Sequence, residues 1–252
     1  MPGSDPHVTR RHGLSAWYAT PAGVHYLDGV RAALSCTVPG IFGFHAVHAG
    51  PDISGVDLLE GSRINRRFRM NGEGSTLRGL LESLPFAADS LDLLLLVHAL
   101  EFSDNPHQIL REVERALVPE GHLLIVGFNP FSQMGLARFA RLGRGVEPWR
   151  GRYYSRRRIC DWLALLGFDV LEVRYAGFVP PFGSDGLVTR LAFLDRLGAR
   201  WLRKIGGVYI LLARKRVTTL TPIRPRWSPR RHLGSSPGLA GTTNMENTCL
   251  KK

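Results

Sequence analysis

Cysteine is scarce in this sequence, with three residues, Cys36, Cys160 and Cys249, spread far apart along 252 positions. An odd number of widely spaced thiols indicates neither a disulfide framework nor a zinc cluster. His45 and His48 are three apart, which on a strand places them on opposite faces and excludes a shared metal site. We therefore expect reduced cysteines and no bound metal.

Long hydrophobic runs are also missing. No uninterrupted apolar run reaches the roughly 20 residues that a membrane-spanning helix needs. The N-terminal residues do not combine a basic end, an apolar stretch and a small-residue cleavage site, so a secretory signal is not indicated. We expect a cytoplasmic protein that is not integral to a membrane. Hydrolase and kinase assignments lose support because no Gly-x-Ser-x-Gly and no Gly-Lys-Ser motif occurs.

Acidic residues are few toward the C-terminal end, so the formal net charge of +12 is unevenly spread. Residues 1–100 contain eight Lys and Arg against nine Asp and Glu, whereas residues 201–252 contain eleven against the single Glu246. A basic segment attracts acidic partners such as nucleic acid or anionic lipid. We expect a flexible lead over residues 1–16, a folded domain over 17–216 and a basic disordered tail over 217–252.

Arginines also gather in the middle of the chain, between Arg138 and Arg158, with Trp149, Tyr153 and Tyr154 interleaved among them. Such a stretch can bind phosphates and stack on bases, or it can be a solvated connector. Residues 187–204 pair large apolar residues with arginines, which suits an anionic membrane surface equally well.

Short apolar runs alternate with helical patterns along the chain. Residues 91–97 form a near-continuous apolar run, as expected for a strand buried on both faces. Asn105 and Gln108 have capping-box spacing, and the helix that follows them ends before Pro119 and Gly121. The apolar run 122–128 then completes a strand–helix–strand unit, which makes its two strands parallel. Further strands are predicted over residues 42–50, 64–70, 168–175 and 208–214, and further helices after Thr20 and Ser155.

The segment 84–128 resembles the type-11 subgroup of class I S-adenosylmethionine-dependent methyltransferases. The resemblance rests on the Leu-Pro-Phe turn at 84–86, the His-Ala-Leu-Glu at 98–101, the Asn-Pro helix start at 105–106 and the Pro-Glu-Gly turn at 119–121. Segments 127–139 and 161–168 have counterparts in a bacterial branch of that family. The resemblance implies an α/β fold, a Rossmann-like three-layer sandwich. Its sheet would have seven mostly parallel strands and end in an antiparallel hairpin of 168–175 and 208–214.

The resemblance also implies where S-adenosylmethionine binds, namely outside the carboxyl ends of the strands where the strand order reverses. In relatives the first strand ends in an acidic residue and a glycine-rich loop, and only glycine lets the backbone approach the cofactor so closely. This sequence keeps Gly50, followed by Asp52, and lacks the preceding acid. Glu73 is the nearest candidate for the ribose hydroxyls, and Asp57 is a weaker one. Leu80 corresponds to the acidic residue that places the adenine in relatives, with Leu81 and Glu82 beside it.

Three polar features of the same region have both a functional and a structural interpretation. His98 follows a strand and can contact cofactor or substrate, or serve as a structural hydrogen-bond partner. Glu101 can act similarly, or be a solvated loop carboxylate. Residues Asn129-Pro130-Phe131 resemble the Asn-Pro-Pro-Phe motif of amino-methylating enzymes, but they lack the second proline and follow the apparent fifth strand instead of the fourth. A simple loop entry is their alternative interpretation.

The sequence thus predicts an enzyme that transfers the methyl group of S-adenosylmethionine to an unidentified oxygen, nitrogen or carbon acceptor by direct displacement. The predicted cofactor-binding residues are Gly50, Asp52, Glu73, Leu81, Glu82 and His98, and no residue is assigned as catalytic. One alternative is a non-catalytic protein of this fold that binds nucleic acid or an anionic surface through its basic C-terminal half. A methyltransferase acting on nucleic acid is the third hypothesis.

Overall fold

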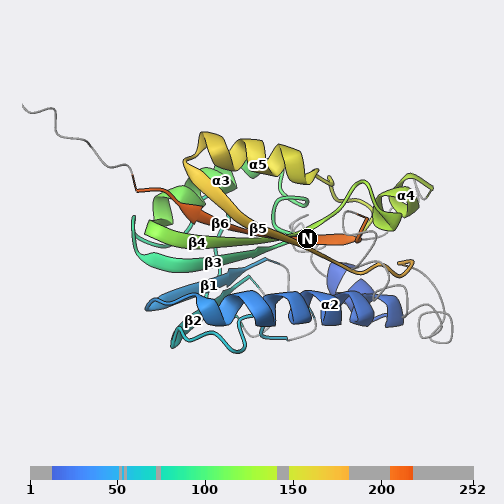
Figure 1. The fold of residues 1–252 in the computed structure, drawn as a ribbon, viewed down its shortest axis with the longest axis horizontal. Coiled ribbons are helices and arrows are strands. Elements are labelled where there is room, and N and C mark those ends of the chain that lie inside the picture. The colour runs from blue at the N-terminus through green and yellow to red at the C-terminus, as the bar shows by residue number, and fades with distance from the viewer. Residues whose placement is uncertain are drawn as a thin grey trace, which may run out of the picture. The chain divides into compact units, whose positions relative to one another are not determined.

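Six strands form a single sheet in the computed structural model, which describes residues 13–50, 53, 56–71, 75–140, 148–181 and 205–217. The spatial order is β2-β1-β3-β4-β6-β5 (Figure 1). Strands β1 to β4 are parallel, and β6 runs antiparallel to both β4 and β5. In chain order the strands are β1 (His45–Ala49), β2 (Arg66–Met70), β3 (Leu91–Val97), β4 (Leu117–Phe128), β5 (Phe168–Ala176) and β6 (Val208–Lys215).

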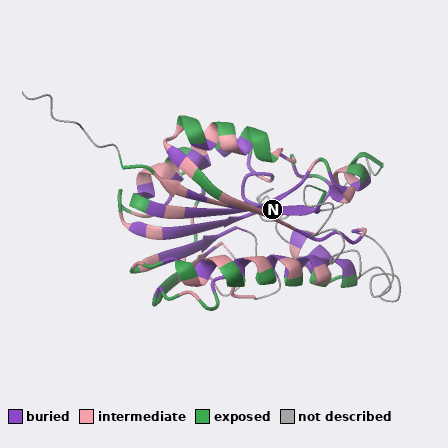
Figure 2. Ribbon diagram, viewed as in Figure 1, coloured by how far each residue is buried: buried purple, intermediate pink, exposed green. Residues whose placement is uncertain are grey.

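Helices cover both faces of the sheet and give three layers (Figure 1). Leu93, Leu95 and Val97 of β3 pack with α2 (Pro21–Thr37) in one apolar core, whereas Leu94 and Leu96 pack with α3 (Pro106–Ala116) and α5 (Arg156–Leu165) in the other. Side chains of a strand alternate between faces, so a strand covered on both sides must be apolar throughout. Figure 2 shows this buried sheet between helices whose outer sides are exposed.

The predicted helix starts are confirmed. The side chains of Thr20, Asn105 and Ser155 accept hydrogen bonds from backbone N–H groups three residues ahead, at 3.2, 3.2 and 3.4 Å. Each therefore satisfies a donor that the first helical turn leaves without a partner. Gly167 ends α5 with a φ of 78°, as its position predicts.

The fold class is confirmed, but the described residues form six strands where seven were expected. Between β2 and β3 the chain makes only two isolated bridges, Met70 with Leu77 and Leu80 with Ser83. Here side-chain hydrogen bonds take the place of backbone pairing between strands. The Asn71 side chain donates to the Gly79 carbonyl (2.7 Å) and accepts from the Gly79 amide (3.0 Å). The arginines of β2 are explained by its place at the edge of the described sheet, where charged residues are tolerated.

All described residues lie in one compact unit of the chain, Met1–Val217. Residues 13–18 are helical, and Leu14 is buried in the apolar core that contains side chains of α2 and β3. The expected tail over 217–252, apart from Val217, and the whole arginine-containing segment 187–204 lie outside the described residues, so the domain limits stay a prediction. Within the described part of the chain, no helix is long and apolar enough to cross a bilayer.

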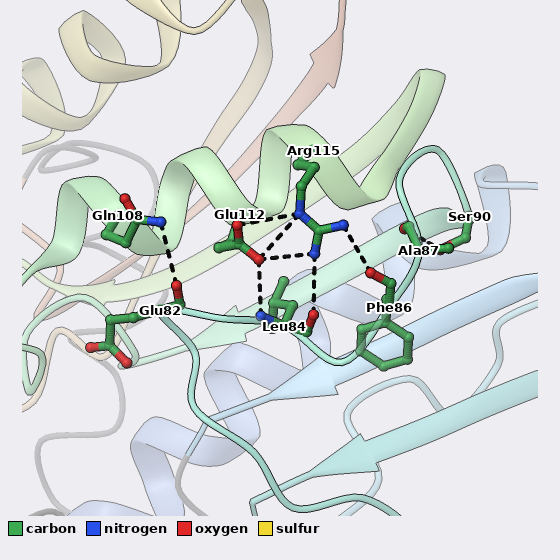
Figure 3. Close-up of polar contacts among 8 residues, drawn as sticks. All are labelled: Glu82, Leu84, Phe86, Ala87, Ser90, Gln108, Glu112 and Arg115. Atoms are coloured by element: carbon green, nitrogen blue, oxygen red, sulfur yellow. Dashed lines mark hydrogen bonds and ion pairs between the residues drawn. The ribbon is translucent and has the colours of Figure 1, made fainter.

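An ion pair on α3 holds the Leu84–Phe86 turn (Figure 3). The Arg115 guanidinium donates to the carbonyls of Phe86 (2.9 Å) and Leu84 (3.1 Å) and to the Glu112 carboxylate (2.9 Å). Glu112 in turn accepts from the Leu84 amide at 3.0 Å. The hydrogen bond with Arg115 is the main reason that the pKa of Glu112 lies below its usual value. The pair thereby fixes the segment that leads from the predicted adenine-binding residues into β3.

We expect Arg115→Met to lower the free energy of unfolding by about 1–2 kcal/mol, because the Leu84 and Phe86 carbonyls lose their charged donor. Arg111→Met is the matched control on the same helix, since Arg111 is exposed and contacts only Gln108 at 3.5 Å. It should change stability by less than about 0.5 kcal/mol. Urea denaturation followed by circular dichroism measures both. Equal losses in the two variants would contradict a specific role for Arg115.

Candidate functional site

The carboxyl ends of β1 and β3 lie side by side at one edge of the sheet. Strand β1 is flanked by β2 on one side and β3 on the other, so the strand order reverses at β1. In open α/β sheets, ligands bind outside the strand ends at such a switch point. The residues that follow β1 and β3, Gly50 and His98, are therefore the centre of the candidate site.

Gly50 allows the loop after β1 to approach the end of β3. Its φ is 145°, and a Cβ at this position would lie 2.3 Å from the Val97 carbonyl oxygen. A side chain is excluded there by both backbone conformation and contact. The structural interpretation of Gly50 is thus supported directly, and its contact with the cofactor stays a prediction. Asp52, two residues later, lies outside the described residues.

His98 is buried and joined to two other buried polar side chains. Its Nε2 lies 2.6 Å from the Tyr18 hydroxyl, and its Nδ1 lies 3.3 Å from the Glu101 carboxyl. The same Glu101 oxygen accepts a hydrogen bond from the Phe128 amide at 2.7 Å. The ring of His98 stacks on that of Phe128, with centroids 3.9 Å apart. Glu101 is therefore not a solvated loop carboxylate, because it is buried and ties β4 to the loop after β3.

The surroundings of Tyr18 determine whether its hydroxyl is protonated. Burial, followed by the nearby charge of Glu101, raises the pKa of Tyr18 well above its usual value, so the phenol keeps its proton. The Tyr18 hydroxyl can then donate to Nε2, and Nδ1–H of His98 donates to Glu101. Both ring nitrogens are engaged in these contacts, so His98 holds Tyr18 and Glu101 in place. His98 also has a φ of 47°, a strained conformation that is frequent at functional sites.

The end of β2 carries a residue that the sequence did not point to. Asn71, with a φ of 68°, binds Gly79 through both side-chain atoms. The only available signal was that asparagine tolerates this left-handed conformation. Glu73, the predicted ribose ligand, lies outside the described residues. Asp57, the weaker candidate, pairs with Arg67 at 3.3 Å and accepts from the Leu59 amide, so its carboxylate supports the β1–β2 connection.

The predicted adenine-binding residues lie beside the loop that follows β3. Leu80 is exposed, whereas Leu81 is buried with Ala99 and Leu100. The Glu82 carboxylate accepts a hydrogen bond from the Ser103 hydroxyl at 2.6 Å. The structure thus brings Leu81 and Glu82 together with residues 98–103, and it places Leu80 outside this cluster.

The Asn129-Pro130-Phe131 segment is a loop entry. The Asn129 side chain donates to the Gly206 carbonyl (2.9 Å) and accepts from the Phe131 amide (3.1 Å). Its amide is therefore committed to the loop, as the alternative interpretation expected. Two of the aromatic residues among the arginines, Trp149 and Tyr154, are also buried, so they cannot stack on bases as one interpretation of that stretch required.

We expect Gly50→Ala to lower the free energy of unfolding by about 2–4 kcal/mol, because it adds backbone strain and a clash with Val97. Gly61→Ala is a suitable control, since Gly61 also has a positive φ (84°) but nothing lies within 4 Å of its added Cβ. That variant should lose only about 1 kcal/mol. Urea denaturation compares the two. A Gly50→Ala variant no less stable than Gly61→Ala would disprove the close approach to Val97.

Comparisons with known proteins agree with this geometry. Residues 36–125 match the model of a family described as "Methyltransferase domain". The chain is 29% identical over 237 residues to the uncharacterized protein YafS of Escherichia coli (strain K12), covering 93% of this chain and 92% of YafS.

Two solved structures have the same fold. A crystal structure of an S-adenosylmethionine-dependent methyltransferase from Thermotoga maritima matches with a TM-score of 0.61 at 20% identity, covering 83% of this chain and 99% of that one. Another from Mesorhizobium loti matches with a TM-score of 0.52 at 20% identity, covering 75% and 100%. Residues 36–125 thus match a methyltransferase-domain family, and the chain has the fold of S-adenosylmethionine-dependent methyltransferases.

Proposed function

We propose that this chain transfers the methyl group of S-adenosylmethionine to an acceptor molecule by direct displacement. The observation that supports this most is the switch point itself. There Gly50 ends β1 against Val97, and the strained His98 begins the loop after β3. Ligands of parallel α/β sheets bind at such a place. The family match is independent support for the same activity.

The described residues fit the cofactor in part. Buried Leu81 offers an apolar contact for the adenine, and the Glu82 carboxylate beside Ser103 offers a hydrogen-bond acceptor. At the end of β2 the fit is poorer, because the Asn71 amide is already bound to Gly79. We assign Gly50 and Asp52 to the methionine moiety, Glu73 to the ribose hydroxyls, and Leu81 and Glu82 to the adenine. His98 positions Tyr18 and Glu101 at the end of β3.

When bound, S-adenosylmethionine supplies a sulfonium-activated methyl group. The chain then needs only to hold donor and acceptor in line, since proximity and orientation provide much of the acceleration in such displacements.

We expect the full chain to bind S-adenosylmethionine and S-adenosylhomocysteine in calorimetric titrations. Glu82→Gln should weaken the binding of S-adenosylhomocysteine about ten-fold, because a charged hydrogen-bond acceptor is lost. Glu60→Gln is the control, since Glu60 is exposed and makes only a long ion pair with Arg31, at 3.8 Å. Its affinity should equal that of the unaltered chain. If no binding occurs at millimolar ligand, the chain is not a methyltransferase enzyme.

A second candidate function is a non-catalytic protein of this fold that binds nucleic acid or another acidic partner through its basic C-terminal half. The observation that favours it is the tight packing of the site: His98 and Tyr18 are buried, and the Cβ position of Gly50 is taken by the Val97 carbonyl.

If the second candidate is right, the full chain retains single-stranded oligonucleotides at low salt, and a chain lacking residues 217–252 retains them more weakly, because charge neutralisation dominates such binding. Filter retention at increasing salt measures both proteins. Failure of both to retain nucleic acid would reject the nucleic-acid hypotheses. Retention together with cofactor binding would instead favour a methyltransferase that acts on nucleic acid.

A further inference from the structure

Helix α4 (Gln133–Ala140) and the loop before it expose an apolar surface. Phe131, Leu136 and Phe139 are 77, 70 and 76% exposed. The opposite side of the helix is also apolar, because Met134 and Ala137 are buried. A surface helix of a globular protein normally presents polar side chains to water. We name Phe131, Leu136 and Phe139 the α4 patch; Figure 2 shows the exposed positions of this helix beyond the covered sheet.

The α4 patch is hollowed. A pocket of about 400 Å³ lies among Phe131, Leu136, Phe139 and Tyr153. This volume is within the range of small-molecule sites. The exposed apolar side chains therefore line a shared hollow, which suits an apolar ligand.

Cationic side chains surround the α4 patch. Arg138 lies over the Tyr153 ring at 5.4 Å, and its Nε donates to the Gly151 carbonyl at 3.0 Å. That hydrogen bond brings the segment with Arg150 and Arg152, both exposed, beside α4. Along the sequence, residues 129–160 contain eight arginines and a single acidic residue, Glu147. Among the described residues, Arg138, Arg150 and Arg152 thus place positive charge beside the apolar face.

The apolar side chains and the arginines together distinguish among three classes of binding partner. Nucleic acid would satisfy the arginines, but the exposed aliphatic Leu136 offers no surface for base stacking, and the neighbouring Trp149 and Tyr154 are buried. A second copy of the chain would cover the apolar side chains, but an isologous contact would bring like charges together. An anionic bilayer satisfies both features, because apolar side chains enter the headgroup boundary while arginines meet lipid phosphates. We infer that the α4 patch docks this protein on an anionic lipid surface.

The test is co-sedimentation of the full chain with vesicles. Vesicles of phosphatidylcholine and phosphatidylglycerol in equal parts should bind the protein, vesicles of phosphatidylcholine alone should bind it much more weakly, and salt should weaken binding to the mixed vesicles. Phe131→Ser combined with Phe139→Ser should reduce binding to the mixed vesicles about ten-fold or more, because two large apolar side chains are lost. Arg150→Gln combined with Arg152→Gln should reduce binding to the mixed vesicles by about five-fold for each charge removed.

The matched control is Phe42→Ser combined with Phe44→Ser. These phenylalanines are 65 and 78% exposed, and they precede β1 at the opposite edge of the sheet. This variant should bind mixed vesicles within about two-fold of the unaltered chain. Thermal unfolding of all variants verifies that they fold, and the single Phe139→Ser variant replaces the double one if the latter does not.

Three outcomes would overturn the inference. One is that the unaltered chain does not bind mixed vesicles at low salt. Another is equal binding by the α4-patch variant and the Phe42/Phe44 control. The third is that the α4-patch substitutions abolish oligonucleotide retention or dimer formation while vesicle binding is unchanged, which would assign the patch to nucleic acid or to a second copy.

Discussion

The contact between α3 and the Leu84–Phe86 turn is the constraint on which the candidate site depends. Arg115 and Glu112 bind both the donor and the acceptor groups of this turn, so the chain enters β3 in one register. The same turn carries Leu81 and Glu82 to the loop after β3, where Glu82 meets Ser103. This contact thus helps to fix the start of the central strand and the predicted adenine-binding segment.

At the carboxyl end of β3, close packing holds the chain in place, whereas the Arg115–Glu112 ion pair does so at the other end. Gly50 lies against Val97, and His98 turns the chain in a strained conformation that Tyr18, Glu101 and Phe128 hold in place. Strain of this kind persists only where the surroundings determine it. The described polar residues of the site are therefore engaged in hydrogen bonds with one another.

Local features of the fold could be predicted from the sequence because they depend on neighbouring residues. The caps at Thr20, Asn105 and Ser155 and the doubly buried β3 are of this kind. Long-range polar contacts could not be predicted. In the sequence, Arg115 and Glu112 lie opposite the apolar side of their helix, yet they bind a turn about 30 residues earlier. Tyr18 meets His98 across 80 residues, and no periodicity indicates such a pair. Likewise, burial removed Trp149 and Tyr154 from the predicted base-stacking surface.

The central claim is that S-adenosylmethionine or its product binds at the carboxyl ends of β1 and β3. Hydrogen–deuterium exchange of the full chain with and without saturating S-adenosylhomocysteine tests it most directly. The account predicts slower exchange in the segments that contain Gly50, Glu82 and residues 98–103, and unchanged exchange in α2 and α5. Protection confined to other segments, or none at all, would contradict it.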